Sequence, residues 1–150
     1  MKFLLFWAIF LCPLLESYSF DKGPSDNGSK SKASGIVFFK GTLSQALKKA
    51  KVEGKMVFID SYTVWCGPCK HLKNNIFPDE NFSKFINENY VPMSINIEKG
   101  EGPKIKRKYP HYTFPTLLFI KNDGKLKNRF VGLPTYGAQE LLNFAILASK

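Results

Sequence analysis

The chain has 150 residues, of which 44% are hydrophobic and 15% aromatic, enough to build the core of one domain. Lys and Arg number 22 against 12 Asp and Glu, which gives a formal net charge of +10. The basic residues are scattered and no RNA-binding or helix-turn-helix signature accompanies them. We therefore expect a solvated basic surface and no nucleic-acid partner.

The N-terminus has the pattern of a signal peptide. Residues 3–15 form an apolar run that is too short for a comfortable membrane span. Small residues near its end predict cleavage after Ser19, so that residues 1–19 are lost and the protein is exported to the periplasm or secreted. Two alternatives stay open. One is an uncleaved anchor, and the other is lipid modification of Cys12, which the bulky residues before that cysteine do not favour.

Residues 20–35 predict a flexible linker, because they are rich in Gly, Ser and Lys and almost lack apolar side chains. Residues 36–40 (IVFFK) then have the composition of a strand. A helix is expected to begin at Thr42, where Gln45 completes a capping box, and to end at Gly54.

A regular order of elements follows. Residues 56–60 are a continuous apolar run, which predicts a buried strand. A helix is expected to begin near Cys66 and to continue through Lys73. The remaining expected elements are a helix after Pro78, a strand at 90–98, a basic helix at 100–110, strands at 116–120 and 126–132, and a helix at 135–149. This order predicts an α/β fold with a central mixed β-sheet flanked by helices on both faces.

Cys66 and Cys69 are the pair most informative about chemistry. After loss of residues 1–19 they are the only cysteines left. A zinc site would also need His71 and His111, and His71 follows Cys69 too closely for a zinc finger. The Cys-x-x-Cys spacing therefore favours a redox pair over a metal site. We expect both histidines on the surface, since nothing in the sequence pairs them.

Residues 36–150 resemble the thioredoxin family. The resemblance rests on WCGPCK at 65–70, Asp60 before it, FPTLLF at 114–119 and FVG at 130–132. With its N-terminal segment, the chain is most similar to exported thioredoxin-like proteins of bacteria. The resemblance implies a thioredoxin fold and a monomeric protein-disulfide oxidoreductase without cofactor or metal. Its substrates would be protein thiols and disulfides, and a membrane donor would supply electrons, because the compartment is oxidising.

The resemblance implies that Cys66, Cys69 and Asp60 are catalytic. The positive end of a helix would stabilise a thiolate at Cys66, so Cys66 is expected to attack the substrate. Cys69, one turn further on and more buried, would resolve the mixed disulfide. A buried Asp60 should have a raised pKa, and the family uses this position to take the proton of the buried cysteine.

Other positions are expected to bind the substrate. They are Trp65, Gly67, Pro68, Phe114, Pro115 and Gly132. A cis peptide bond at Pro115 would expose the backbone of Phe114 to an added substrate strand. The family usually has a Lys where this chain has Ser94, and Ile or Thr where it has Phe114, so proton handling and partner choice are expected to differ.

Three functions stay open at this point. The Gly-Pro dipeptide between the cysteines favours a reductase of protein disulfides. The same pair could serve a disulfide oxidant or isomerase. A module that only binds a partner in the groove around Pro115 is the third reading, although binding alone does not require two cysteines.

Overall fold

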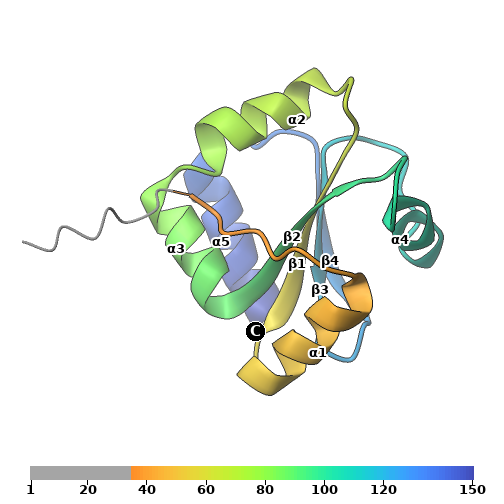
Figure 1. The fold of residues 1–150 in the computed structure, drawn as a ribbon. Coiled ribbons are helices and arrows are strands. Elements are labelled where there is room, and N and C mark those ends of the chain that lie inside the picture. Colours follow the sequence, from red (N-terminus) through yellow and green to blue (C-terminus); the bar gives the residue numbers. More distant parts are fainter. Residues whose placement is uncertain (1–34) are drawn as a thin grey trace, which may run out of the picture. The chain divides into compact units, whose positions relative to one another are not determined.

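The structure is a computed structural model that describes residues 35–150 (Figure 1). The predicted signal peptide, Cys12 and the linker up to residue 34 lie outside the described residues. The helices are α1 (Leu43–Glu53), α2 (Gly67–His71), the π-helical η1 (Leu72–Ile76), α3 (Glu80–Asn89), α4 (Gly102–Lys108) and α5 (Ala138–Ser149). The strands are β1 (Met56–Tyr62), β2 (Tyr90–Asn96), β3 (Thr116–Ile120) and β4 (Leu126–Val131).

The four strands form one mixed sheet in the order β2-β1-β3-β4. Strand β1 is parallel to β2 and antiparallel to β3, and β4 is antiparallel to β3. Successive side chains of β1 point to opposite faces, so Val57 and Ile59 enter one core while Phe58 enters the other. The predicted α/β fold with a mixed central sheet is confirmed.

Helices cover both faces of this sheet (Figure 1). Side chains from α1 and α4 pack in the core with Val57 and Ile59, and side chains from η1, α3 and α5 pack in the core with Phe58. The predicted capping box starts α1, because the Thr42 hydroxyl accepts from the Gln45 N–H and the Gln45 side chain accepts from the Thr42 N–H. Among residues 35–150, no helix is long and apolar enough to span a bilayer.

The prediction of a strand at residues 36–40 is wrong. This segment is extended and Phe39 N–H donates to the Pro92 carbonyl on β2, at 2.7 Å. Pro92 has no N–H with which to return a bond, so a regular ladder does not continue past the edge of β2. The sheet of the described chain therefore has four strands.

Candidate active site

Cys66 and Cys69 form a disulfide at the start of α2, with their Cα atoms 5.3 Å apart. Cys66 is the N-cap residue, and its Sγ accepts the Cys69 N–H at 3.1 Å. Pro68 lies in the first turn, where its missing N–H would have had no partner in the helix. Both cysteines are buried. The pair therefore lies where a helix N-terminus can stabilise a thiolate.

Asp60 is a buried carboxylic acid on β1, 4% exposed. Its Oδ2 accepts from the Ser94 hydroxyl at 2.8 Å, whereas Oδ1 has no hydrogen-bond partner in the described chain. Burial raises the pKa of Asp60 to about 6, although the bond from Ser94 and the charge of Lys73 act in the opposite direction. The expected neighbour, Ser94, is also its register partner on β2.

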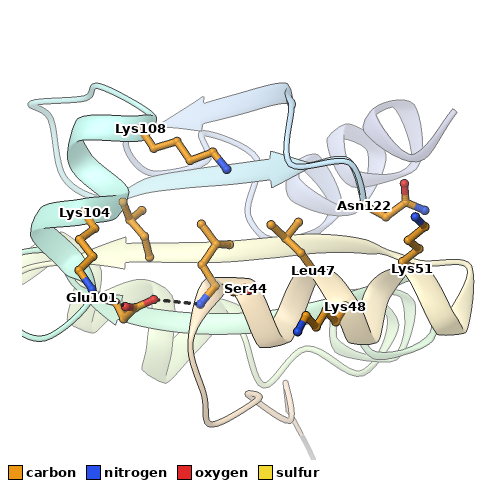
Figure 2. Close-up of a pocket in the computed structure, with 10 residues that line it drawn as sticks. Ser44, Leu47, Lys48, Lys51, Glu101, Lys104, Lys108 and Asn122 are labelled. Carbon is orange, nitrogen blue, oxygen red and sulfur yellow. Dashed lines mark hydrogen bonds and ion pairs between the residues drawn. The ribbon is translucent and has the colours of Figure 1, made fainter.

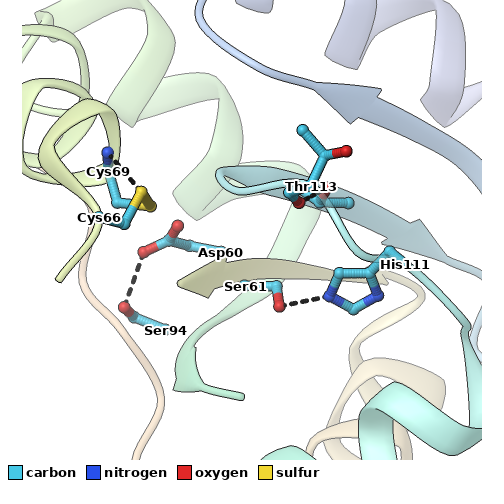
Figure 3. Close-up of a disulfide and its surroundings, with 8 residues drawn as sticks. Asp60, Ser61, Cys66, Cys69, Ser94, His111 and Thr113 are labelled. Carbon is cyan, nitrogen blue, oxygen red and sulfur yellow. Dashed lines mark hydrogen bonds between the residues drawn. A yellow bond between two sulfur atoms is a disulfide. The ribbon is translucent and has the colours of Figure 1, made fainter. Parts of the chain in front are cut away.

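A cavity of about 240 Å³ connects Asp60 with the disulfide. Its lining includes Asp60, Thr63, Cys69, Lys73 and Ser94. Figure 3 shows the Asp60 side chain between the sulfur atoms and Ser94. Asp60 and Cys69 therefore face the same cavity.

The peptide bond between Phe114 and Pro115 is cis, as expected. The Pro115 carbonyl accepts the Gly132 N–H at 2.8 Å, which ties this loop to the end of β4. Gly132 has a φ of 87°, which side chains other than glycine rarely adopt, while a Cβ there would meet no atom within 4 Å. Backbone conformation, and not crowding, therefore explains the glycine.

Trp65 is 67% exposed beside the disulfide, yet its position is defined by two contacts. Its indole N–H donates to Glu98 Oε1 at 3.1 Å. Its ring lies edge-on to Phe114, with centroids 6.1 Å apart. Phe114 in turn lies edge-on to His111, at 5.7 Å. The rings form a wall that joins the disulfide loop to the cis-proline loop.

A family model described as a thioredoxin-like domain matches residues 43–144. The chain belongs to the thioredoxin-like family. A candidate disulphide-isomerase from Bacteroides thetaiotaomicron, with a known solution structure, is 39% identical and has a TM-score of 0.69. This match covers 79% of this chain and 97% of that chain. The chain thus combines the fold of this family with a disulfide between two cysteines at the start of α2.

Two curated relatives match smaller parts of this chain. The thiol:disulfide interchange protein DsbD of Colwellia psychrerythraea is 30% identical in an alignment of 108 positions, which covers 67% of this chain and 18% of DsbD. The thioredoxin of Rickettsia felis is 33% identical over 89 residues, which are 59% of this chain and 79% of that protein. The chain thus spans under a fifth of the DsbD it matches.

The prediction that His111 lies on the surface of this thioredoxin-like domain is wrong. The side chain is buried, and its Nδ1 and Nε2 each lie 2.6 Å from a partner, the Tyr109 carbonyl oxygen and the Ser61 hydroxyl. A carbonyl oxygen can only accept, so Nδ1–H donates to Tyr109 and Nε2 accepts from Ser61. Burial lowers the pKa of His111, and Arg129 and Lys106 lower it further.

Sequence reasoning missed this contact between Ser61 and His111 because no local pattern encodes it. Ser61 follows Asp60 on β1, and His111 comes 50 residues later in the loop before the cis-proline (Figure 3). His71 is exposed, as expected. Among residues 35–150, no three His, Cys, Asp or Glu side chains gather as metal ligands do.

Proposed function

We propose that this chain is an exported oxidoreductase that reduces protein disulfides through Cys66 and Cys69. The observation that supports this most directly is a disulfide at the N-terminus of α2 that shares a cavity with the buried carboxyl group of Asp60. Each part suits one step of thiol–disulfide exchange, which needs a thiolate, a resolving thiol and a proton acceptor.

The reaction starts from the reduced pair. The Cys66 thiolate attacks one sulfur of the substrate disulfide, the substrate S–S bond breaks, and the first substrate thiolate leaves and takes a proton from water. Cys69 then gives its proton to Asp60, which is ionised at pH 7 because its pKa is about 6. The Cys69 thiolate attacks Cys66 Sγ and the S–S bond between Cys66 and the substrate breaks. The second substrate sulfur leaves as a thiolate and takes up the proton held by Asp60. Two electrons have passed to the substrate, and the Cys66–Cys69 disulfide seen here is the product.

The exposed rim of the disulfide would receive the substrate. Trp65, Gly67 and Pro68 are exposed at this rim. Beyond them lies the cis peptide bond of Phe114 and Pro115. We assign substrate contact to these positions and to Gly132, whose N–H already pairs with the Pro115 carbonyl. An extended substrate segment would add its backbone next to Phe114.

The direction of electron flow and the compartment are part of the proposal. The Gly67–Pro68 dipeptide supports a reducing pair, and the signal-like segment at residues 1–19 supports export. An exported reductase needs a membrane electron donor, because its compartment is oxidising. One observation favours isomerase activity as a second candidate: the 39% identical relative is described as a disulphide-isomerase candidate.

The reduction potential of the Cys66–Cys69 pair tests the direction. Protein lacking residues 1–19 would be equilibrated with dithiothreitol and glutathione buffers, and the oxidised fraction measured by thiol labelling. A reduction potential of about −270 mV supports the reductase, and a potential above roughly −180 mV would instead indicate an isomerase or oxidant. A Cys66→Ser, Cys69→Ser variant should not reduce a model protein disulfide.

A further inference from the structure

A groove of about 580 Å³ lies beside α4 and is distinct from the cavity around Asp60. Its lining includes Ile97, Glu98, Lys106, Arg107, Pro110 and Tyr112. We call this the α4 groove. One wall comes from the segment that follows β2, one from α4, and one from the loop that leads to the cis-proline.

The α4 groove adjoins the rim of the disulfide through Glu98. Glu98 lines the groove and accepts the indole N–H of Trp65, the residue before Cys66, at 3.1 Å. At the other side, Tyr112 lies two residues before Phe114, whose ring contacts Trp65. Tyr112 is 82% exposed. A substrate segment next to Phe114 therefore has an open aromatic surface leading into the groove.

The charges of the groove are largely available to a ligand. Lys106 and Arg107 form no ion pair with any acid of residues 35–150, and Lys106 Nζ lies 5.4 Å from the centre of the Tyr112 ring. Glu98, whose Oε1 accepts from Trp65, is the one acid among the lining residues, against the two cations Lys106 and Arg107. The other two lysines of α4, Lys104 and Lys108, line a different cavity, and Lys104 pairs there with Glu101 at 3.3 Å. The field in the groove is therefore positive, and it complements carboxylates.

We propose that the α4 groove binds an acidic segment of the substrate protein, so that the enzyme selects cysteines that have Asp or Glu within a few residues in the sequence. This inference rests on the proposed thiol–disulfide exchange, and it adds the chemistry of the partner. Carboxylates would pair with Lys106 and Arg107, while the apolar parts of the segment would contact Tyr112 and Pro110. The charges act mainly on the rate of encounter, so the preference should weaken as salt is added.

The experiment compares two peptides that each contain one intramolecular disulfide. They differ only in the three residues before the first cysteine and the three residues after the second, which are Glu in one peptide and Gln in the other. Second-order rate constants are measured in both directions, with reduced protein on the disulfide peptides and with oxidised protein on the dithiol peptides. We expect the Glu peptide to react about five-fold faster than the Gln peptide at low salt.

Two double variants with the same change of charge test whether the α4 groove or another basic surface causes the preference for the Glu peptide. Lys106→Gln, Arg107→Gln should bring the ratio of the two rates close to one. Lys48→Gln, Lys51→Gln should keep it. Lys48 and Lys51 are on the C-terminal half of α1 and line another cavity, between α1 and α4 (Figure 2). This half of α1 leads to the start of β1, the end of that strand opposite to Cys66.

Each result decides the proposal. A ratio that survives in the Lys106, Arg107 variant, or that falls equally in both variants, would overturn it, because the groove would then have no specific role. Protein that oxidises the dithiol peptides but does not reduce the disulfide peptides would refute the reductase function alone. The ratio from the oxidising direction would still decide whether the groove selects acidic segments.

Discussion

Asp60 is the residue whose chemistry is set most clearly by its surroundings. Burial raises the pKa of its carboxyl group to about 6. In the proposed reaction, only the ionised form can accept a proton from Cys69. We predict that the rate of mixed-disulfide resolution falls as the pH drops below about 6. Asp60→Asn should remove this inflection and slow resolution at pH 7 by roughly 100-fold. Rapid-quench measurements between pH 5 and 8 would show it, and an unchanged inflection in the variant would assign it to another group.

Measuring the stability of Asp60→Asn tests whether misfolding, and not the lost carboxyl group, slows resolution in this variant. The pKa of Asp60 is higher in the folded chain than its ordinary value of 3.8, so unfolding releases a proton between about pH 4 and 6. The free energy of unfolding therefore decreases as the pH rises through this range. Asp60→Asn escapes this loss and should be more stable by up to about 3 kcal/mol at pH 8, with no such gain at pH 4. Urea unfolding at both pH values measures this difference.

At the scale of elements, the contact of His111 with Ser61 joins β1 to the loop that carries the cis peptide bond. His111→Asn should destabilise the fold by about 1–3 kcal/mol at pH 7.5, because it removes a buried hydrogen bond. The penalty should shrink at pH 5. There the unfolded wild type binds a proton that the folded state resists, since burial lowers the pKa of His111.

Urea unfolding at the two pH values tests this prediction. Comparing the variant with the wild type cancels the contribution of Asp60, provided that the two sites act independently. His71→Asn is the control, because His71 is exposed and its substitution should change stability by less than about 0.5 kcal/mol. A penalty for His111→Asn that is equal at both pH values would show that His111 acts by packing alone.

The sequence predicted the elements that carry strong local signals. The capping box at Thr42 was sufficient to predict the start of α1, and the apolar run was sufficient to predict β1. The burial of Asp60 follows from its place in that run. The prediction of a strand at 36–40 failed because strand pairing depends on the neighbouring segment. Here that neighbour is Pro92, which comes 53 positions after Phe39. The prediction of an exposed His111 failed for the same reason, since its burial comes from tertiary contacts with Ser61 and Phe114.

The α4 groove marks a further limit of sequence reasoning. The basic residues of the chain are scattered in sequence, and their distribution alone predicts a solvated surface. Folding brings Lys106 and Arg107 of α4 to the same hollow as Glu98 and Tyr112. Glu98 is occupied by Trp65 in the folded chain, which no spacing in the sequence indicates. A local positive field therefore arises from the order of loops around the sheet and not from a run of charges.

At the scale of the whole molecule, the proposed function depends on where the chain is delivered. A disulfide reductase with a membrane electron donor is useful only outside the cytoplasm, where disulfides persist. The pattern of residues 1–19 predicts that export removes them. We therefore expect that the full chain, produced in a bacterial host with an export system, yields protein of residues 20–150 in the periplasm or medium.

Mass spectrometry of the exported protein distinguishes the three fates of the N-terminus. Cleavage after Ser19 gives a new N-terminus at Phe20. An uncleaved anchor leaves the full mass in the membrane fraction, and lipid modification would leave a chain that begins at Cys12 with added acyl mass. Ser19→Pro should block cleavage and retain the protein at the membrane. Recovery of the full-length wild type in the cytoplasm would contradict export and, with it, the need for a membrane donor.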